Sequence, residues 1–172
     1  VWVTVGSEAA RAVLERGAGP SSTILATMLT RRTFENLLSE SGGGRQKGGV
    51  TALVLDQPLE RQVHMVSLLL PEKKRLGILV GPQSRFAVPR LQQMVGKYGL
   101  TLEVEEVKSE DSVVPAANRL LSRSDVLLAL PDLLVYHRNH VRPILLASYY
   151  HKRPVIGYSS AFVDAGALAA LY

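Results

Sequence analysis

The chain has no cysteine, few aromatic residues and no long hydrophobic run. The absence of cysteine from its 172 residues excludes disulfides, thiolate catalysis and thiolate metal sites. No run of about eighteen or more apolar residues occurs, so the sequence predicts no membrane-spanning helix. Aromatic residues make up only 6% of the chain, whereas 47% of residues are hydrophobic and 20% are charged. This composition is typical of a folded globular protein.

Signatures of catalysis and of metal binding are also missing. Gly42–Gly44 lacks the preceding strand and following helix of a dinucleotide-binding loop, and no Walker lysine pattern occurs. Ser159 has no partner histidine of the kind that a nucleophile elbow requires. His137 and His140 could share a helix face, but no carboxylate at metal-ligand spacing joins them. We therefore expect no catalysis, no cofactor and no bound metal.

The charge balance is basic but dispersed. The formal net charge is +5 and the calculated pI is about 9.7. The cations fall in small groups at predicted helix ends and turns: Arg31–Arg32, Arg45–Lys47, Lys73–Arg75, Arg138–Arg142 and Lys152–Arg153. Because no aromatic residues alternate with them, the pattern favours solvated edges over a nucleic-acid surface. We expect no nucleic-acid partner.

Short apolar runs alternate with helix-like segments along the whole chain. The predicted strands are Val1–Val5, Thr23–Met28, Val50–Leu55, Arg75–Val80, Thr101–Val107, Asp125–Leu130 and Val155–Tyr158. The predicted helices are Ser7–Arg16, Thr33–Leu38, Leu59–Leu70, Ser84–Tyr98, Ser112–Leu121 and Tyr136–His151, and a further apolar run covers Ala165–Leu171. This alternation predicts an α/β fold built from right-handed crossovers, with parallel sheets covered by helices on both faces.

The pattern also divides into two lobes. We expect an N-terminal lobe over residues 1–57 and a C-terminal lobe over residues 58–172, because Pro58 begins a helix after the third strand. The glycine-rich segment 42–49 is predicted to be a flexible loop. A single doubly wound sheet of about seven strands is the alternative.

Several predicted strands end in small or polar residues. In open α/β sheets, ligands bind beyond the carboxyl ends of the strands, and N–H groups of the following helices can hold an anion. The residues that we expect to line such a ligand site are Ser7, Glu8, Thr27, Gln83, Ser84, Arg85, Asp132, Tyr158, Ser159 and Ser160. The alternative is that the serines only cap helices and that Pro131-Asp132 only forms a turn.

Within this set the side chains suggest a division of roles. Ser84, Ser159 and Ser160 would offer hydroxyl and N–H groups to a carboxylate, and Arg85 would add positive charge. Three aromatic residues around the last two strand ends would cover a ring or apolar part of the ligand, unless they only pack in the core: Tyr136, Tyr158 and Phe162.

Three ordered segments carry a resemblance to a known family. They are Val3–Ala10, Leu70–Leu79 and Pro154–Ser160, the last followed by Ala165–Leu171. In this order they resemble the ABC-transporter substrate-binding family, and in particular the branch that includes tryptophan- and phenylalanine-binding periplasmic proteins. The resemblance implies a type I periplasmic-binding fold with a solute held in a cleft between two lobes.

The resemblance also implies a function and a location. The chain would be the extracytoplasmic solute-binding component of an ABC transporter, with a small carboxylate-bearing or aromatic solute and a membrane permease as partners. It would be periplasmic or extracytoplasmic, with or without a lipid anchor. We expect the chain to be a piece of a longer protein that lacks the family's leader, first strand and helix, and returning C-terminal segment, which leaves the N-terminal lobe incomplete.

Two segments depart from the pattern of the amino-acid binders. Gly81–Ser84 stands where those proteins usually show Asn-Pro-Ser, and Leu130–Asp132 stands where a Pro-Thr-Asp-Asn type of loop is common. The ligand class therefore stays open. The alternative function is that of a cytoplasmic Rossmann-like enzyme that acts on a nucleotide or a phosphorylated substrate.

Overall fold

The chain forms two compact units, each with its own parallel sheet. The structure is a computed structural model that describes residues 1–17, 19, 22–41 and 49–172, so residues 42–48 of the predicted flexible loop lie outside the described residues. Unit 1 covers Val1–Asp56 and unit 2 covers Gln57–Tyr172. Unit 1 has a three-stranded sheet and unit 2 a five-stranded one. The alternative of one continuous sheet is therefore wrong.

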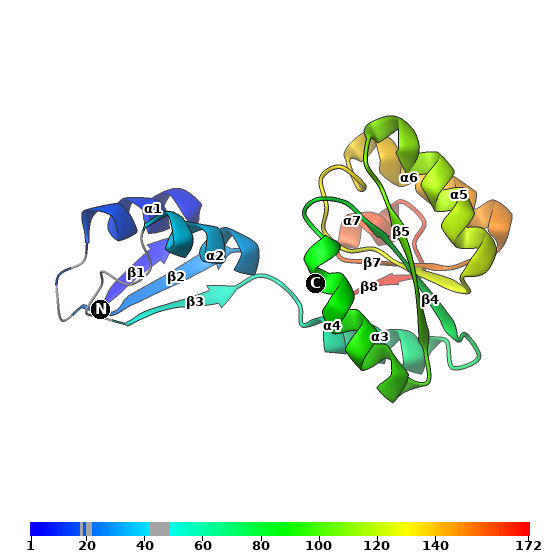
Figure 1. Cartoon of the computed structure of the whole chain (residues 1–172), viewed down its shortest axis with the longest axis horizontal. Helices are drawn as coiled ribbons and strands as arrows, with labels where there is room; N and C mark the ends of the chain where they lie inside the picture. Colours follow the sequence, from blue (N-terminus) through cyan, green and yellow to red (C-terminus); the bar gives the residue numbers. More distant parts are fainter. Residues whose placement is uncertain (18, 20–21, 42–48) are drawn as a thin grey trace. The chain divides into compact units, whose positions relative to one another are not determined.

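Unit 1 is a small βαβαβ arrangement. Its strands β1 (Trp2–Val5), β2 (Ile24–Leu29) and β3 (Val50–Val54) pair in parallel in the order β1-β2-β3. Its helices α1 (Ser7–Arg16) and α2 (Arg31–Glu40) connect them and lie on the same side of the sheet (Figure 1). Two short parallel crossovers thus build the unit, as the alternating pattern predicts.

The helix α2 shows why the sequence prediction of Thr33–Leu38 was too short. Thr30 is the N-cap residue, and its hydroxyl accepts a hydrogen bond from the Thr33 backbone N–H at 3.2 Å. Asp56 accepts a second one from the Arg31 N–H at 2.5 Å. A local cap and a distant carboxylate together satisfy donors at the start of the helix, and only the first can be read from the local sequence.

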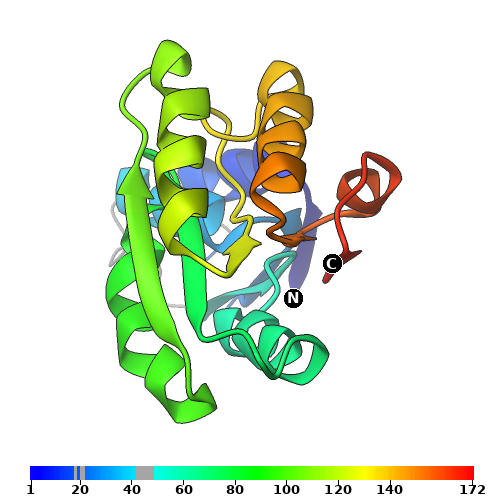
Figure 2. The same cartoon turned by 90° about the vertical axis from the view of Figure 1, so that its right-hand side faces the viewer.

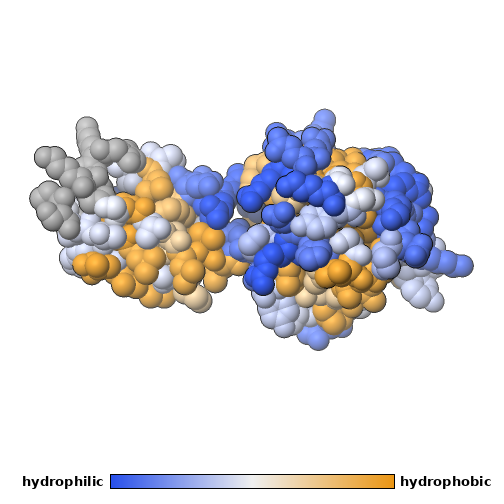
Figure 3. Space-filling model, turned by 90° about the horizontal axis from the view of Figure 1, so that it is seen from below, coloured by the Kyte–Doolittle hydropathy of each residue, from blue (hydrophilic) through white to orange (hydrophobic). Residues whose placement is uncertain are grey.

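Only one face of the unit 1 sheet is covered within the described residues. The core packs the inner faces of α1 and α2 against Ile24 and Ala26 of β2. On the opposite face, Val3 is 62% exposed, Val5 is 66% exposed and Leu53 is 68% exposed. The hydrophobic residues that gather on this unit are visible in Figure 3. The expectation that helices cover both faces of the sheet is wrong for unit 1 as described.

Unit 2 is a larger parallel sheet with the strand order β5-β4-β6-β7-β8. The strands are β4 (Arg75–Val80), β5 (Thr101–Glu106), β6 (Val126–Leu128), β7 (Val155–Gly157) and β8 (Ala169–Ala170). The helices are α3 (Leu59–Leu69), α4 (Val88–Val95), α5 (Val113–Arg123), α6 (Arg138–His151) and α7 (Ser160–Asp164). Short 3₁₀ turns lie at Arg85–Ala87, Gly96–Tyr98 and Glu110–Ser112. All the paired strands are parallel.

In unit 2 both faces of the sheet carry a hydrophobic core. One core joins α5 and α6 to the sheet through residues such as Leu120 and Ile144, and the other joins α3 and α4 through Val63 and Leu91. Figure 2 shows α5 and α6 together on one side of the sheet, with α3 and α4 on the other. Strand residues that are apolar on both sides, such as Leu127 and Leu128, follow from this burial.

Ion pairs stabilise unit 2 in two places: at the amino ends of β4 and β6, and between α5 and the edge strand β5. Asp125 accepts hydrogen bonds from the Arg75 backbone N–H at 3.0 Å and from the Arg75 guanidinium at 2.8 Å, which ties the start of β6 to the start of β4. These bonds, chiefly those of the guanidinium, hold the pKa of Asp125 well below its usual value even though burial acts in the opposite direction. On β5, burial raises the pKa of Glu105, and hydrogen bonds from Arg123 and Arg119 more than offset it.

The remaining element boundaries follow the predicted ones with two exceptions. The predicted helix Ser84–Tyr98 is split into the 3₁₀ turn Arg85–Ala87, α4 and a second 3₁₀ turn. The apolar run Ala165–Leu171 contains only the two-residue strand β8, and the short helix α7 precedes it where no helix was predicted. In the described part of the chain, no helix is both long enough and apolar enough to cross a membrane.

Candidate functional site

The candidate site lies at the carboxyl ends of β4, β6 and β7. β4 lies between β5 and β6 in the sheet. The connection that follows β4 runs to β5, whereas the connection that follows β6 runs the opposite way, to β7. At such a switch point the loops after two neighbouring strands diverge and leave room for a ligand. Here the two loops are Gly81–Ser84 after β4 and Ala129–Asp132 after β6.

Asp132 joins these two loops. Its side chain is only 3% exposed. One carboxylate oxygen accepts hydrogen bonds from the backbone N–H of Gln83, the backbone N–H of Ser84 and the Ser84 hydroxyl, each at 2.9 Å. The other oxygen accepts from the N–H of Leu134 at 3.0 Å. In the reverse direction, the Leu133 N–H donates to Gln83 Oε1 at 3.0 Å. The strand-end loops therefore form one hydrogen-bonded unit.

Gly81 allows the carboxylate to approach this closely. A Cβ atom at Gly81 would lie 2.6 Å from an Asp132 carboxylate oxygen, which is shorter than any real contact of that kind. The Gly81 N–H also donates to the Ser84 hydroxyl at 3.1 Å, and that hydroxyl donates onward to Asp132. Any larger residue at position 81 would displace the carboxylate.

The contacts of Ser84 bear directly on its predicted role. Ser84 is 3% exposed, and both its N–H and its hydroxyl donate to Asp132. An internal carboxylate thus occupies the position at which a ligand carboxylate or phosphate was expected. The turn after β4 is hydrogen-bonded to the loop after β6. The Gln83 N–H, the Ser84 N–H and the Ser84 hydroxyl all donate to Asp132. This geometry also argues against a phosphate-binding loop at Gly81–Ser84.

Aromatic side chains gather at the carboxyl ends of β6 and β7. The Tyr158 and Phe162 rings lie 4.8 Å apart between centroids, and Tyr136 contacts each of them edge-on at 6.0 Å and 5.6 Å. Gly157 permits this packing, because a Cβ there would come within 2.3 Å of Phe162 Cβ. Tyr136 and Phe162 are buried, whereas Tyr158 is half-buried. Tyr158 is therefore the ring of this cluster that reaches solvent.

The surroundings raise the pKa of two tyrosine hydroxyls in this cluster. Burial raises the pKa of Tyr136, and the nearby Tyr158 and Asp132 raise it further. Burial also raises the pKa of Tyr158, with Asp132 adding to the effect. Within the described part of the chain, the buried Tyr136 hydroxyl has no hydrogen-bond partner. Tyr158 thus offers solvent an aromatic ring with one neutral hydroxyl, which suits an uncharged ring better than an ionic group.

The polar residues near the aromatic cluster differ in solvent exposure and in the bonds that they already make within the protein. Ser159 is the N-cap residue of α7 and is half-buried, while Ser160 is exposed. Among the residues that the structure describes, the Ser159 side chain makes no capping hydrogen bond. Arg85 is exposed and forms an ion pair with Glu106 at the end of β5, so its charge is compensated within the protein. The serines after β7 are thus more accessible than Ser84.

Unit 1 has its own strand-end residues. Ser7 was expected to line the ligand site, with capping of α1 as the alternative. Gly6 is the N-cap residue, and Ser7 is the first helical residue, without a side-chain cap bond. Glu8 is exposed in the first turn, where its charge favours the helix dipole. Thr27 donates its hydroxyl to the backbone oxygen of Thr4 at 2.9 Å. The donor of Thr27 is therefore used within the sheet.

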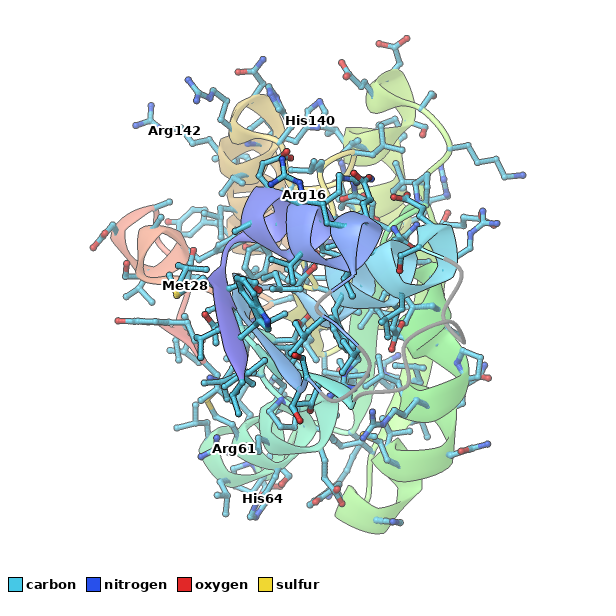
Figure 4. The ribbon with its side chains drawn as sticks, turned by 90° about the vertical axis from the view of Figure 1, so that its left-hand side faces the viewer. Arg16, Met28, Arg61, His64, His140 and Arg142 are labelled. Atoms are coloured by element: carbon cyan, nitrogen blue, oxygen red, sulfur yellow. The ribbon has the colours of Figure 1, made fainter. Side chains whose placement is uncertain are left out.

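Met28 marks the carboxyl end of β2. It has a positive φ of 58°, and the register between β2 and β3 shifts between Thr27 and Leu29. Met28 is 61% exposed, and Figure 4 labels it on unit 1. A non-glycine residue with left-handed backbone is strained, and such strain occurs often at functional positions.

Sequence reasoning missed two exposed apolar residues in the strand-end loops of unit 2. Phe86 is 60% exposed in the 3₁₀ turn after β4, and Leu133 is 73% exposed directly after Asp132. The sequence placed Phe86 in a regular amphipathic helix, where its exposure cannot be predicted. In the described ranges, no group of three potential metal-binding side chains comes together.

Comparison with known proteins gives a family and a fold. Residues 34–172 match the family model of ABC transporter substrate binding proteins. No curated protein sequence matches the chain significantly. Among solved structures, a conserved domain protein from Vibrio cholerae is similar with a TM-score of 0.68 and 24% identity, over 98% of this chain and 56% of that one.

Two further structures share the fold. An ABC domain from Streptococcus pneumonia, solved in complex with L-Trp, has a TM-score of 0.67 and 22% identity, over 98% of this chain and 56% of that one. A ligand-free, open substrate binding protein with adhesive properties from Clostridium difficile has a TM-score of 0.66 and 17% identity, over 89% and 51%. The chain thus spans little more than half the length of these structures.

Proposed function

We propose that this chain, which belongs to the family of ABC transporter substrate-binding proteins, binds a small solute with an aromatic or other planar apolar part at the carboxyl ends of the unit 2 strands. It would work outside the cytoplasmic membrane and deliver the solute to an ABC permease. The proposal assigns no reaction to the chain. We keep the two lobes at residues 1–57 and 58–172, one residue away from the division between the two compact units.

The observation that carries the proposal is the aromatic cluster at the end of β7. Tyr158 is half-buried and its ring packs against Phe162, while burial and then Asp132 raise the pKa of its hydroxyl. Solute sites are mostly apolar, with a few polar groups that fix orientation. The exposed Phe86 and Leu133 extend the apolar surface along the same strand ends. The L-Trp complex of the streptococcal protein of similar fold supports a ring as ligand.

The polar part of the solute would contact the serines after β7. Ser159 and Ser160 offer hydroxyls beside the Tyr158 ring, and Ser84 is left to its bonds with Asp132. In this arrangement Gln83, Arg85 and Asp132 shape the strand-end loops. Ser7, Glu8 and Thr27 would act only at the strand ends of unit 1.

The test is a thermal-shift screen followed by calorimetry. Amino acids, their amides, and indole and phenyl carboxylates would be screened first, because a ligand that binds only the folded state raises the apparent stability. For a hit with a ring, Tyr158→Ala should weaken binding several-fold to about tenfold, since an aromatic pair contributes about 0.5–1.5 kcal/mol beyond the area that it buries. If Ser159 contacts a carboxylate of the ligand, the amide form of the ligand should bind the wild type more weakly than the carboxylate form does. The Ser159→Ala variant should also bind the carboxylate form more weakly than the wild type does.

The matched control is Tyr98→Ala. Tyr98 is also half-buried and stacks on a ring, that of His64 at 5.3 Å, but it precedes β5 rather than following a strand end. Its replacement should leave the affinity unchanged. Equal affinities of wild type and Tyr158→Ala would remove the aromatic cluster from the site, and a screen in which no ring-bearing compound binds would contradict the proposed ligand class.

A further inference from the structure

The outward face of α6 carries an unusual set of side chains. Arg138 and Arg142 are exposed one turn apart. Further along the same face, Leu146 is 55% exposed, Tyr149 is 78% exposed and Tyr150 is 74% exposed. We call these five residues the α6 face. The solvent side of a surface helix is normally polar, so large apolar and aromatic side chains here need a physical reason.

The chain segment that contains this face carries charge of one sign between Asp132 and Asp164. Residues 133–163 contain no Asp or Glu, although they include Arg138, Arg142, Lys152 and Arg153. Arg153 is partly neutralised, because it lies 3.6 Å from Asp125. No ion pair is recorded for the other three cations among the described residues, and Figure 4 shows Arg142 extending outward from α6. The face thus offers unneutralised positive charge beside exposed rings.

A shallow groove adjoins the face. It has a volume of about 660 Å³ and runs between α6 and the residues that follow α7, with Arg142, Leu146 and Tyr149 on one side and Ala165 and Gly166 on the other. The small residues leave space beside the aliphatic side chains. The groove could receive an apolar chain or a headgroup while Arg142 stays at its border.

We propose that the α6 face binds the surface of a bilayer that contains anionic phospholipids. Arg forms paired hydrogen bonds with phosphate, and Tyr prefers the membrane–water boundary, where its ring is apolar and its hydroxyl stays wet. A helix face of this mixture is typical of peripheral membrane contact. A second copy of the chain fits poorly, because it would bring arginine against arginine. The contact would keep the protein at the membrane in which its transporter lies.

The experiment is co-sedimentation of the whole chain with vesicles. Vesicles of phosphatidylglycerol and phosphatidylcholine in equal parts should bind the protein at low salt, and pure phosphatidylcholine vesicles should bind it much less. Each basic residue near an anionic surface strengthens binding about fivefold, so Arg138→Glu/Arg142→Glu should weaken it about 20-fold or more. Tyr149→Ser/Tyr150→Ser should weaken it several-fold. Higher salt should weaken binding by the wild type.

The control is the double variant Arg90→Glu/Lys97→Glu, with Arg90 on α4 and Lys97 in the 3₁₀ turn that follows it. Both residues are exposed, and the double change alters net charge by the same amount as the α6 change. Vesicle binding should be close to that of the wild type in this variant. The proposal is overturned if the wild type does not sediment with phosphatidylglycerol vesicles. It is also overturned if the control variant and the Arg138→Glu/Arg142→Glu variant lose vesicle binding equally, because net charge alone would then explain the binding. Solute binding, measured separately, should not change in the α6 variants.

Discussion

Asp132 is the residue on which the candidate site depends most, although it was expected to contact a ligand. A buried carboxylate is tolerated only when hydrogen bonds replace its hydration, and Asp132 has donors from both strand-end loops. The same bonds consume the donors of Ser84. One residue therefore orders both loops and occupies the N–H and hydroxyl donors of the turn after β4. The accessible polar groups of the site are then those after β7.

We expect Asp132→Asn to lower the free energy of unfolding by about 1–3 kcal/mol, because an amide oxygen replaces a charged acceptor and an NH₂ group faces backbone donors. Urea unfolding followed by circular dichroism would measure the change. Asp111→Asn is the control: Asp111 is exposed, and this variant should differ from wild type by less than about 0.5 kcal/mol. Equal midpoints for all three proteins would mean that the Asp132 bonds do not stabilise the fold.

At the scale of elements, unit 2 is fastened at both ends of its strands. Asp125 links β4 and β6 at their amino ends, and Asp132 links the loops at their carboxyl ends. The two strands are distant in the chain, and β5 is formed between them. Polar contacts at both ends thus stabilise the pairing of β4 with β6, which are not consecutive in the chain.

The Asp125 bonds predict a pH dependence of stability. The folded state holds the pKa of Asp125 below the value of about 4 that an unfolded aspartate has. The contribution is therefore fully present above about pH 5 and is lost as the pH falls below about 4. Urea unfolding between pH 6 and pH 2.5 should show a steeper loss for wild type than for Asp125→Asn, which has no such group to titrate. Parallel profiles would contradict this assignment.

The sequence predicted the elements of unit 2 well, because short apolar strands and amphipathic helices each leave a local pattern. Leu59–Leu69 and Arg75–Val80 fall within a residue of their predicted bounds. The two-sheet arrangement and the family were also predicted. The hydrogen bond between Ser84 and Asp132 was not predicted, because the two residues are 48 positions apart in the chain. Serine and aspartate are also common in helix caps and turns, so their types alone did not indicate this contact. The exposure of Phe86 was missed for a similar reason, since an apolar residue near a helix start gives no sign of which way it points.

At the scale of the whole molecule, the two units differ in how they cover their sheets. Unit 2 has a core on both faces, whereas unit 1 as described leaves an apolar face open. Parallel sheets are almost always buried on both sides, and exposed apolar patches promote association. The weaker packing of unit 1 is therefore expected to dominate how the chain behaves at high concentration.

Replacing Leu53 by lysine should reduce concentration-dependent self-association of the chain without unfolding it. Leu53 is 68% exposed on the open face, and Leu68 on α3 of unit 2 is exposed to the same 68%. The Leu68→Lys variant is thus a matched control, since a single exposed leucine outside a sheet face is ordinary. Sedimentation equilibrium over a range of concentrations should show a lower average mass for Leu53→Lys only. Equal masses for the two variants would show that the open face does not associate.

The bonds of Asp132 have a consequence for the order in which unit 2 folds. They join residues 48–50 positions apart, so they cannot form until β4, β5 and β6 have been brought together. Closing a chain segment of this length is entropically unfavourable before other contacts compensate for it. We therefore expect the candidate site to be completed no earlier than the pairing of β4 with β6, which joins residues equally far apart in the chain. Contacts that form only after the folding transition state stabilise a protein mainly by slowing its unfolding.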